Sequence, residues 1–167
     1  MDGAVRSLSL KGRALRLLGT REHSRAELER KLQPFEQSPG ELARALDELQ
    51  HKGFIDERRV LESVLHRRAA GFGAARIRQE LQRKGLAQDV IHEAVRDLQG
   101  SDLERALALW RKRFGLQGAP SGPDGAREMA RQARYLASRG FSGEVIQRVL
   151  RRAAGGGGAE LPDAREP

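Results

Sequence analysis

The sequence contains no cysteine, which excludes a disulfide framework and a thiolate metal site. Aromatic residues make up only 4% of the chain, and runs rich in Val, Ile, Thr or Tyr, which would indicate strands, are few. No apolar run is long enough for a signal peptide or a membrane span, so we expect a soluble, cytoplasmic protein without membrane contact. Leu, Ala and Arg dominate instead, and they lose little rotamer freedom in helices. These features predict an all-α fold.

A pattern of apolar, basic and glycine residues occurs twice, 55 residues apart, and the two copies align without a gap. The first copy is Arg76, Leu81, Lys84-Gly85-Leu86, Val90-Ile91 and Val95. The second is Arg131, Leu136, Arg139-Gly140-Phe141, Val145-Ile146 and Leu150. A segment that recurs at a fixed interval indicates several copies of one structural unit. We therefore expect three tandem three-helix modules that form an elongated, curved array.

The positions of Gly, Pro and helix-capping residues along the chain indicate where these modules begin and end. Three capping boxes are predicted, at Ser24–Glu27, Ser38–Glu41 and Ser101–Glu104, and Asp56 is expected to cap a further helix. Gly85 and Gly140 are expected to end helices in the left-handed conformation. We expect modules at 13–55, 56–100 and 101–153, with a Gly/Pro-rich insertion at 115–125 in the third module. A flexible N-terminus at 1–12 and a disordered tail at 154–167 are expected to flank them.

The net charge of +8 is unevenly distributed. Residues 1–57 hold ten basic and ten acidic side chains, whereas residues 58–84 have a net charge of +6. Residues 85–110 are net −3, residues 111–152 are net +7, and the remaining tail is net −2. Two basic blocks separated by an acidic one favour a polyanionic partner, such as DNA, RNA or an acidic protein surface. The alternative is that arginine serves only as a soluble helix former.

No constellation of residues indicates an enzyme, and we expect no cofactor and no metal. The four histidines, at 23, 51, 66 and 92, lack metal-ligand spacing and are expected at surface or boundary positions. Gly71-Phe72-Gly73 is superficially similar to a phosphate loop, but it lacks the Gly-Lys-Ser/Thr ending and the preceding strand. A helix stop with Phe72 packed inward is the favoured interpretation.

Basic helices are the better candidates for function. Arg76 and Arg83 share one helix face with Gln79, opposite the apolar pair Ile77 and Leu81. A similar stripe occurs at Arg127, Arg131 and Arg134, and the pair Arg67 and Arg68 ends the preceding helix of the second module. Such stripes can reach phosphates or acidic side chains while the apolar face stays in the core. A solvated helix face without a partner, or an interaction of Arg67 and Arg68 with the helix dipole, is the structural alternative.

Several short motifs resemble the RecX family of bacterial regulatory proteins. They are Arg21-Glu22-His23-Ser24 with Glu27-Leu28 and Lys31-Leu32; Gly53-Phe54-Ile55-Asp56 with Arg59; Gly71-Phe72-Gly73 with Arg76-Ile77, Glu80-Leu81 and Lys84-Gly85; and Tyr135-Leu136 with Arg139-Gly140-Phe141. Each motif is weak alone, but their order and spacing over residues 13–152 are specific. The sequence departs from the family in the stretch 115–125, which is longer and richer in Gly and Pro.

The resemblance implies a non-enzymatic, monomeric modulator that binds the filament of the RecA recombinase on single-stranded DNA. Such a protein lies in the filament groove and inhibits recombination, ATPase activity and the co-protease role in the SOS response, so it acts in DNA repair. Single- or double-stranded DNA is a further expected partner. Among the basic residues, the resemblance adds Lys84 and Arg139 to Arg76 as motif-matched positions.

A different class of function stays open at this point. Three-helix modules with a basic helix also resemble helix-turn-helix DNA-binding proteins that act without RecA. Against base-specific reading, no cluster of Asn, Gln and Arg forms an obvious recognition set. The scarcity of aromatic residues also weakens a single-strand-specific reading, which depends on base stacking.

Overall fold

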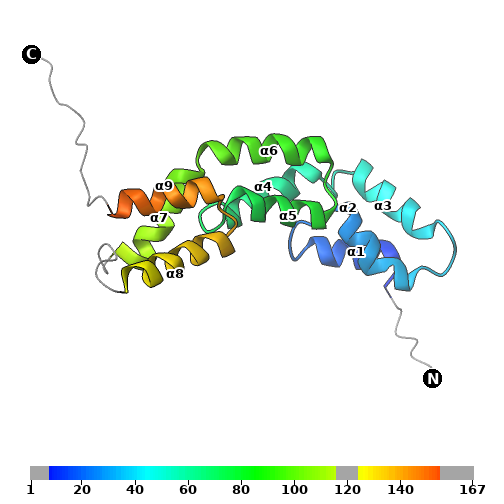
Figure 1. The fold of residues 1–167 in the computed structure, drawn as a ribbon. Helices are drawn as coiled ribbons and strands as arrows, with labels where there is room; N and C mark the ends of the chain where they lie inside the picture. Colours follow the sequence, from blue (N-terminus) through cyan, green and yellow to red (C-terminus); the bar gives the residue numbers. More distant parts are fainter. Residues whose placement is uncertain (1–7, 116–123, 155–167) are drawn as a thin grey trace, which may run out of the picture. The chain divides into compact units, whose positions relative to one another are not determined.

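The structure is a computed structural model that describes residues 8–115 and 124–154 (Figure 1). These ranges contain nine α-helices, one short 3₁₀ helix and no strand, so the predicted all-α fold is confirmed. In chain order the helices are α1 (Leu10–Leu18), α2 (Arg25–Leu32), η1 (Gln33–Phe35), α3 (Glu41–His51), α4 (Glu57–Arg68), α5 (Ala74–Lys84), α6 (Gln88–Gly100), α7 (Asp102–Phe114), α8 (Gly125–Ser138) and α9 (Gly143–Ala154). None of the helices in the described ranges combines the length and the apolarity that crossing a bilayer requires.

The first two helices begin at serine caps. The Ser9 hydroxyl accepts a hydrogen bond from the Gly12 amide at 3.2 Å, so α1 begins at Leu10 and residues 10–12 belong to it rather than to a flexible terminus. The capping box at Ser24 is confirmed, because its hydroxyl accepts from the Glu27 amide and the Glu27 carboxylate accepts from the Ser24 amide. A short polar side chain placed just before a helix satisfies amides that have no partner within the helix.

The other two predicted capping boxes are wrong. Gly40, with φ of 80°, precedes α3, and the carboxylate of Glu36 accepts from the Leu42 amide at 3.1 Å. The Ser101 hydroxyl instead donates to the Leu98 carbonyl at 3.2 Å, because Ser101 follows α6 directly. Asp56 does cap α4, as predicted, through the amides of the two arginines that follow it.

The chain divides into two compact units, which are described separately. Unit 1 comprises residues 1–68 and 77–95, and unit 2 comprises residues 69–76 and 96–167. Parts of the predicted second module therefore belong to each unit. The predicted insertion and tail lie largely outside the described residues, although α9 extends to Ala154.

Each unit has a core made from one stripe of each helix. In unit 1, helices α1 to α3 and the segment after α3 bury mainly leucines: Leu10, Ala14, Leu28, Leu32, Leu42, Leu46, Leu49 and Ile55. In unit 2, helices α7 to α9 and the turn between α8 and α9 bury larger groups together: Leu103, Ala106, Leu107, Trp110, Phe114, Leu136, Phe141, Ile146 and Val149. Leu81 and Leu136, the matched leucines of the two repeat copies, are both fully buried. The helical spacing of apolar residues thus identified the inner faces correctly.

Candidate partner-binding surface

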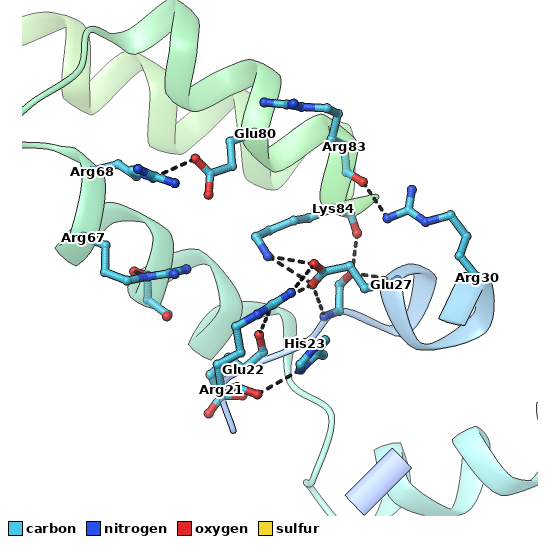
Figure 2. Close-up of polar contacts among 12 residues, drawn as sticks. Arg21, Glu22, His23, Glu27, Arg30, Arg67, Arg68, Glu80, Arg83 and Lys84 are labelled. Atoms are coloured by element: carbon cyan, nitrogen blue, oxygen red, sulfur yellow. Dashed lines mark hydrogen bonds and ion pairs between the residues drawn. The ribbon is translucent and has the colours of Figure 1, made fainter. Parts of the chain in front are cut away.

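In unit 1, three of the predicted basic residues lie at the ends of α4 and α5 (Figure 2). Arg67 and Arg83 are exposed, and each donates a hydrogen bond to a carbonyl of its own helix, that of Ser63 at 3.0 Å and that of Gln79 at 3.3 Å. Arg68 is half-buried and forms an ion pair with Glu80 of α5 at 3.0 Å. These three arginines are called the α4–α5 cluster below.

Lys84, one of the predicted binding residues, does not lie on an exposed surface. The residue is 7% exposed, and its ammonium group donates to both carboxylate oxygens of Glu27, each at 3.0 Å. Its backbone carbonyl accepts a hydrogen bond from the Ser24 hydroxyl. The Arg30 side chain donates to the neighbouring carbonyl of Arg83 at 3.0 Å. Lys84 therefore joins α5 to α2 within unit 1 (Figure 2).

Glu27 is the centre of this polar network. Burial by itself raises the pKa of this carboxyl, but hydrogen bonds from Arg21, Lys84 and the Ser24 amide outweigh burial and lower the pKa to about 2. Arg21 contacts the same carboxylate at 3.0 Å. The adjacent His23 is 2% exposed, contrary to the expected surface position, and burial lowers its pKa. Glu27 is therefore ionised at neutral pH, and its bonds stabilise the contact of α2 with α5.

In unit 2, Arg131 and Arg134 lie on the exposed side of α8, as the predicted stripe requires. Arg131 forms an ion pair with Glu128 at 2.7 Å, and its guanidinium carbon lies 5.4 Å from the centre of the Phe114 ring. Arg134 forms no ion pair with another residue in the described part of the chain. We call Arg131 and Arg134, with exposed Arg127 one turn earlier, the α8 stripe.

Arg139 is half-buried between two aromatic rings. Its guanidinium carbon lies 5.2 Å from the centre of the Phe72 ring and 5.1 Å from that of Tyr135. Its carbonyl accepts from the Gly73 amide at 2.8 Å. The planar charged group thus packs between Phe72, in the turn before α5, and Tyr135 of α8, so Arg139 has a structural role there.

Two glycines of unit 2 allow a close approach of the backbone. A Cβ atom at Gly73 would lie 2.3 Å from the Gly140 carbonyl oxygen, and one at Gly140 would lie 2.6 Å from the Cβ atom of Arg76. Gly140 also has a φ of 85°. Only glycine allows this approach, which places exposed Arg76 beside the end of α8.

Arg105 organises the loop before α5, a role that no motif in the sequence indicated. Arg105 of α7 donates to the carbonyls of Ala69 and Phe72 at 2.7 and 2.6 Å. It also pairs with Asp102, whose carboxylate accepts from the Ala74 amide and whose pKa is raised by burial. These bonds hold the Gly71-Phe72-Gly73 turn in place, so that turn acts as a helix stop.

The motif residues that carry the family resemblance mostly contact one another. In unit 1, Glu27 contacts Arg21 and Lys84, and Arg59 pairs with Glu22 at 3.1 Å. In unit 2, Arg139 contacts Phe72 and Tyr135. The charged motif residues named here are thus partners of each other, whereas Arg67, Arg83 and Arg134 are exposed. In residues 8–115 and 124–154, no three His, Asp or Glu side chains converge on a possible metal position.

These features define a class of protein: an all-helical, modular protein with exposed arginines on its helix faces. Family models for the first, second and third three-helix domains of RecX match residues 11–49, 56–95 and 101–150. The chain therefore belongs to the RecX family.

Curated relatives agree with this assignment over most of the chain. The regulatory protein RecX of Leptothrix cholodnii is 55% identical over 144 residues, which cover 86% of this chain and 88% of that protein. The regulatory protein RecX of Ralstonia nicotianae is 43% identical over 160 residues, or 96% of this chain and 95% of the relative. The crystal structure of RecX from Lactobacillus salivarius has the same fold, with a TM-score of 0.68 at 19% identity, over 86% of this chain and 94% of that one.

Proposed function

We propose that this protein binds the RecA–single-stranded DNA filament and inhibits its recombinase, ATPase and co-protease activities. The observation that carries the proposal is membership of the RecX family across all three helical domains. It acts by binding, as a monomer in the cytoplasm, and catalyses no reaction of its own. Its functional units are the modules 13–55, 56–100 and 101–153.

The charge of the exposed helix faces supports a polyanionic target. The α4–α5 cluster and the α8 stripe present guanidinium groups whose apolar neighbours are buried in the cores, so binding requires no unfolding. Arginine forms paired hydrogen bonds with carboxylates and phosphates, so either an acidic protein surface or a DNA backbone suits it. The α8 stripe and Arg76 are the positions we propose for unit 2, and the α4–α5 cluster is the one for unit 1.

The test is RecA ATPase activity and strand exchange on single-stranded DNA, with this protein added below the RecA concentration. Both rates should fall, because a protein that binds filaments alters many RecA subunits per molecule. A nuclease-treated pull-down from cell extract should still recover RecA. Unchanged RecA activity together with tight, sequence-dependent binding to bare DNA would contradict the proposal and favour the helix-turn-helix alternative.

A further inference from the structure

Unit 1 has a groove lined by residues of α1, α2 and η1, and it includes none of the α4–α5 cluster. Its volume is about 370 Å³, at the lower end of the range of ligand pockets. Its apolar lining consists of Leu8, Leu17, Leu32 and Phe35. Leu8 and Phe35 are 49% and 46% exposed and line the same groove, so together they form an exposed apolar patch of the kind that marks interaction sites.

The walls of the groove are fixed before any ligand binds. The guanidinium carbon of Arg13 lies 4.1 Å from the centre of the Phe35 ring. The same side chain donates a hydrogen bond to the Leu8 carbonyl at 3.0 Å. Arg13 therefore holds both exposed apolar residues in position, which reduces the entropy that a ligand would otherwise lose on binding.

Among the residues that the structure describes, the charged side chains that line the groove are all positive. They are Arg13, Arg16 and Lys31. Positive charge is concentrated locally at this groove, because residues 1–57 as a whole hold equal numbers of acidic and basic side chains. Elsewhere in this part of unit 1, cations such as Lys11 and Arg25 are paired with Glu48 and Asp47. Arg16 and Lys31 form no ion pair with any residue in the described part of the chain.

We propose that this groove binds an acidic peptide segment of a partner protein, with one or two large aliphatic side chains inserted between Leu17, Leu32 and Phe35. The acidic residues that flank this apolar anchor meet Arg16 and Lys31. A second hollow shares Leu8, Arg13 and Phe35 but is also lined by Glu36 and Glu41. Those carboxylates repel an acidic segment, so the peptide binds in the groove lined by Arg16 and Lys31 and not in the second hollow.

The lining favours a peptide over a single-stranded nucleic acid. Base stacking requires open aromatic faces. Phe35 is the one aromatic side chain among the described residues that line this groove, and Arg13 already lies against its ring. The leucines around it suit aliphatic side chains instead. The proposal does not depend on RecA binding, and it concerns residues outside the α4–α5 cluster and the α8 stripe.

The test is fluorescence anisotropy of the full-length protein with a labelled synthetic peptide of about twelve residues, in which two leucines four positions apart are surrounded by Asp and Glu. Phe35→Ala should weaken binding about tenfold, because it removes the exposed wall of the groove. Arg16→Glu with Lys31→Glu should weaken it at least about tenfold. The substituted side chains are exposed or half-exposed, so far-UV circular dichroism should not change.

Matched controls separate this site from general attraction between opposite charges. Arg44→Glu with Arg78→Glu makes the same change in net charge at exposed positions of unit 1, outside the groove and the α4–α5 cluster, and should alter binding less than about twofold. A peptide with serines in place of the leucines should bind at least about tenfold more weakly. Equal binding of the two peptides, or equal loss in the control variant, would overturn the proposal. So would a Phe35→Ala variant that binds the peptide normally but loses affinity for a labelled oligo-dT strand.

Discussion

Replacing Lys84 with Met tests the buried ion pair that joins α2 to α5. Methionine keeps much of the length and the apolar stem of lysine but removes the ammonium group that donates to both oxygens of Glu27. Glu27 is 8% exposed, and its carboxylate would keep only Arg21 and the Ser24 amide as partners. Removing one member of a buried pair costs about 3–5 kcal/mol, because the other charge stays buried without compensation.

The pKa of Glu27 gives an independent estimate of the same size. A fall from the usual 4.5 to about 2 corresponds to roughly 3 kcal/mol of stabilisation at neutral pH from all its partners together. Since Arg21 remains, we expect Lys84→Met to lower the free energy of unfolding by about 2–3 kcal/mol at pH 7. The double variant Glu27→Gln with Lys84→Met should regain part of this loss, since it leaves no unpaired charge.

The sign of the pH dependence follows from the lowered pKa. Glu27 contributes stability that is present above its unfolded pKa of about 4.5 and is lost as pH falls towards 2. The difference in the free energy of unfolding between the wild type and Lys84→Met should therefore become smaller as pH falls from about 4.5 towards 2. Urea unfolding followed by circular dichroism measures this difference. Lys52→Met, which removes an exposed ion pair with Glu48, serves as a control and should hardly change the unfolding midpoint. A Lys84→Met protein as stable as the wild type at pH 7, or a difference that is constant down to pH 2, would refute the reasoning.

Three further predictions concern unit 2. Gly140→Ala should destabilise it by about 1–3 kcal/mol in urea unfolding, because φ is 85° and the new Cβ atom would collide with Arg76. The control Gly143→Ala, where nothing lies within 4 Å of the new Cβ atom, should be close to neutral. Leu136→Ala, at a fully buried position, should cost about 2–5 kcal/mol in the same assay, and a smaller loss would mean that the core closes around the gap. Arg131→Glu with Arg134→Glu should leave the circular dichroism spectrum unchanged but weaken co-sedimentation with RecA filaments. Binding by the wild type should decrease as salt rises, and salt-independent binding would assign these arginines to solubility alone.

The sequence alone was sufficient where the interactions are local. The apolar spacing identified the buried faces of the helices, including Leu81 and Leu136, because a helix places residues three and four positions apart on one side. The Ser24 capping box and the glycines that end α5 and α8 were also predictable, because each depends on a few neighbouring residues. The exposure of Arg83, Arg131 and Arg134 follows from the same periodicity.

Tertiary structure decided the positions whose partners are distant in sequence. Lys84 and Arg83 are adjacent cations, yet one is buried against Glu27, 57 residues away, while the other is exposed. Arg139 matches Lys84 in the repeat but packs between aromatic rings in unit 2. Periodicity assigns a side chain to a face of its helix, but only the packing of other helices decides whether that face meets a carboxylate, a ring or water. The charged surface that remains for a partner is therefore set by the fold.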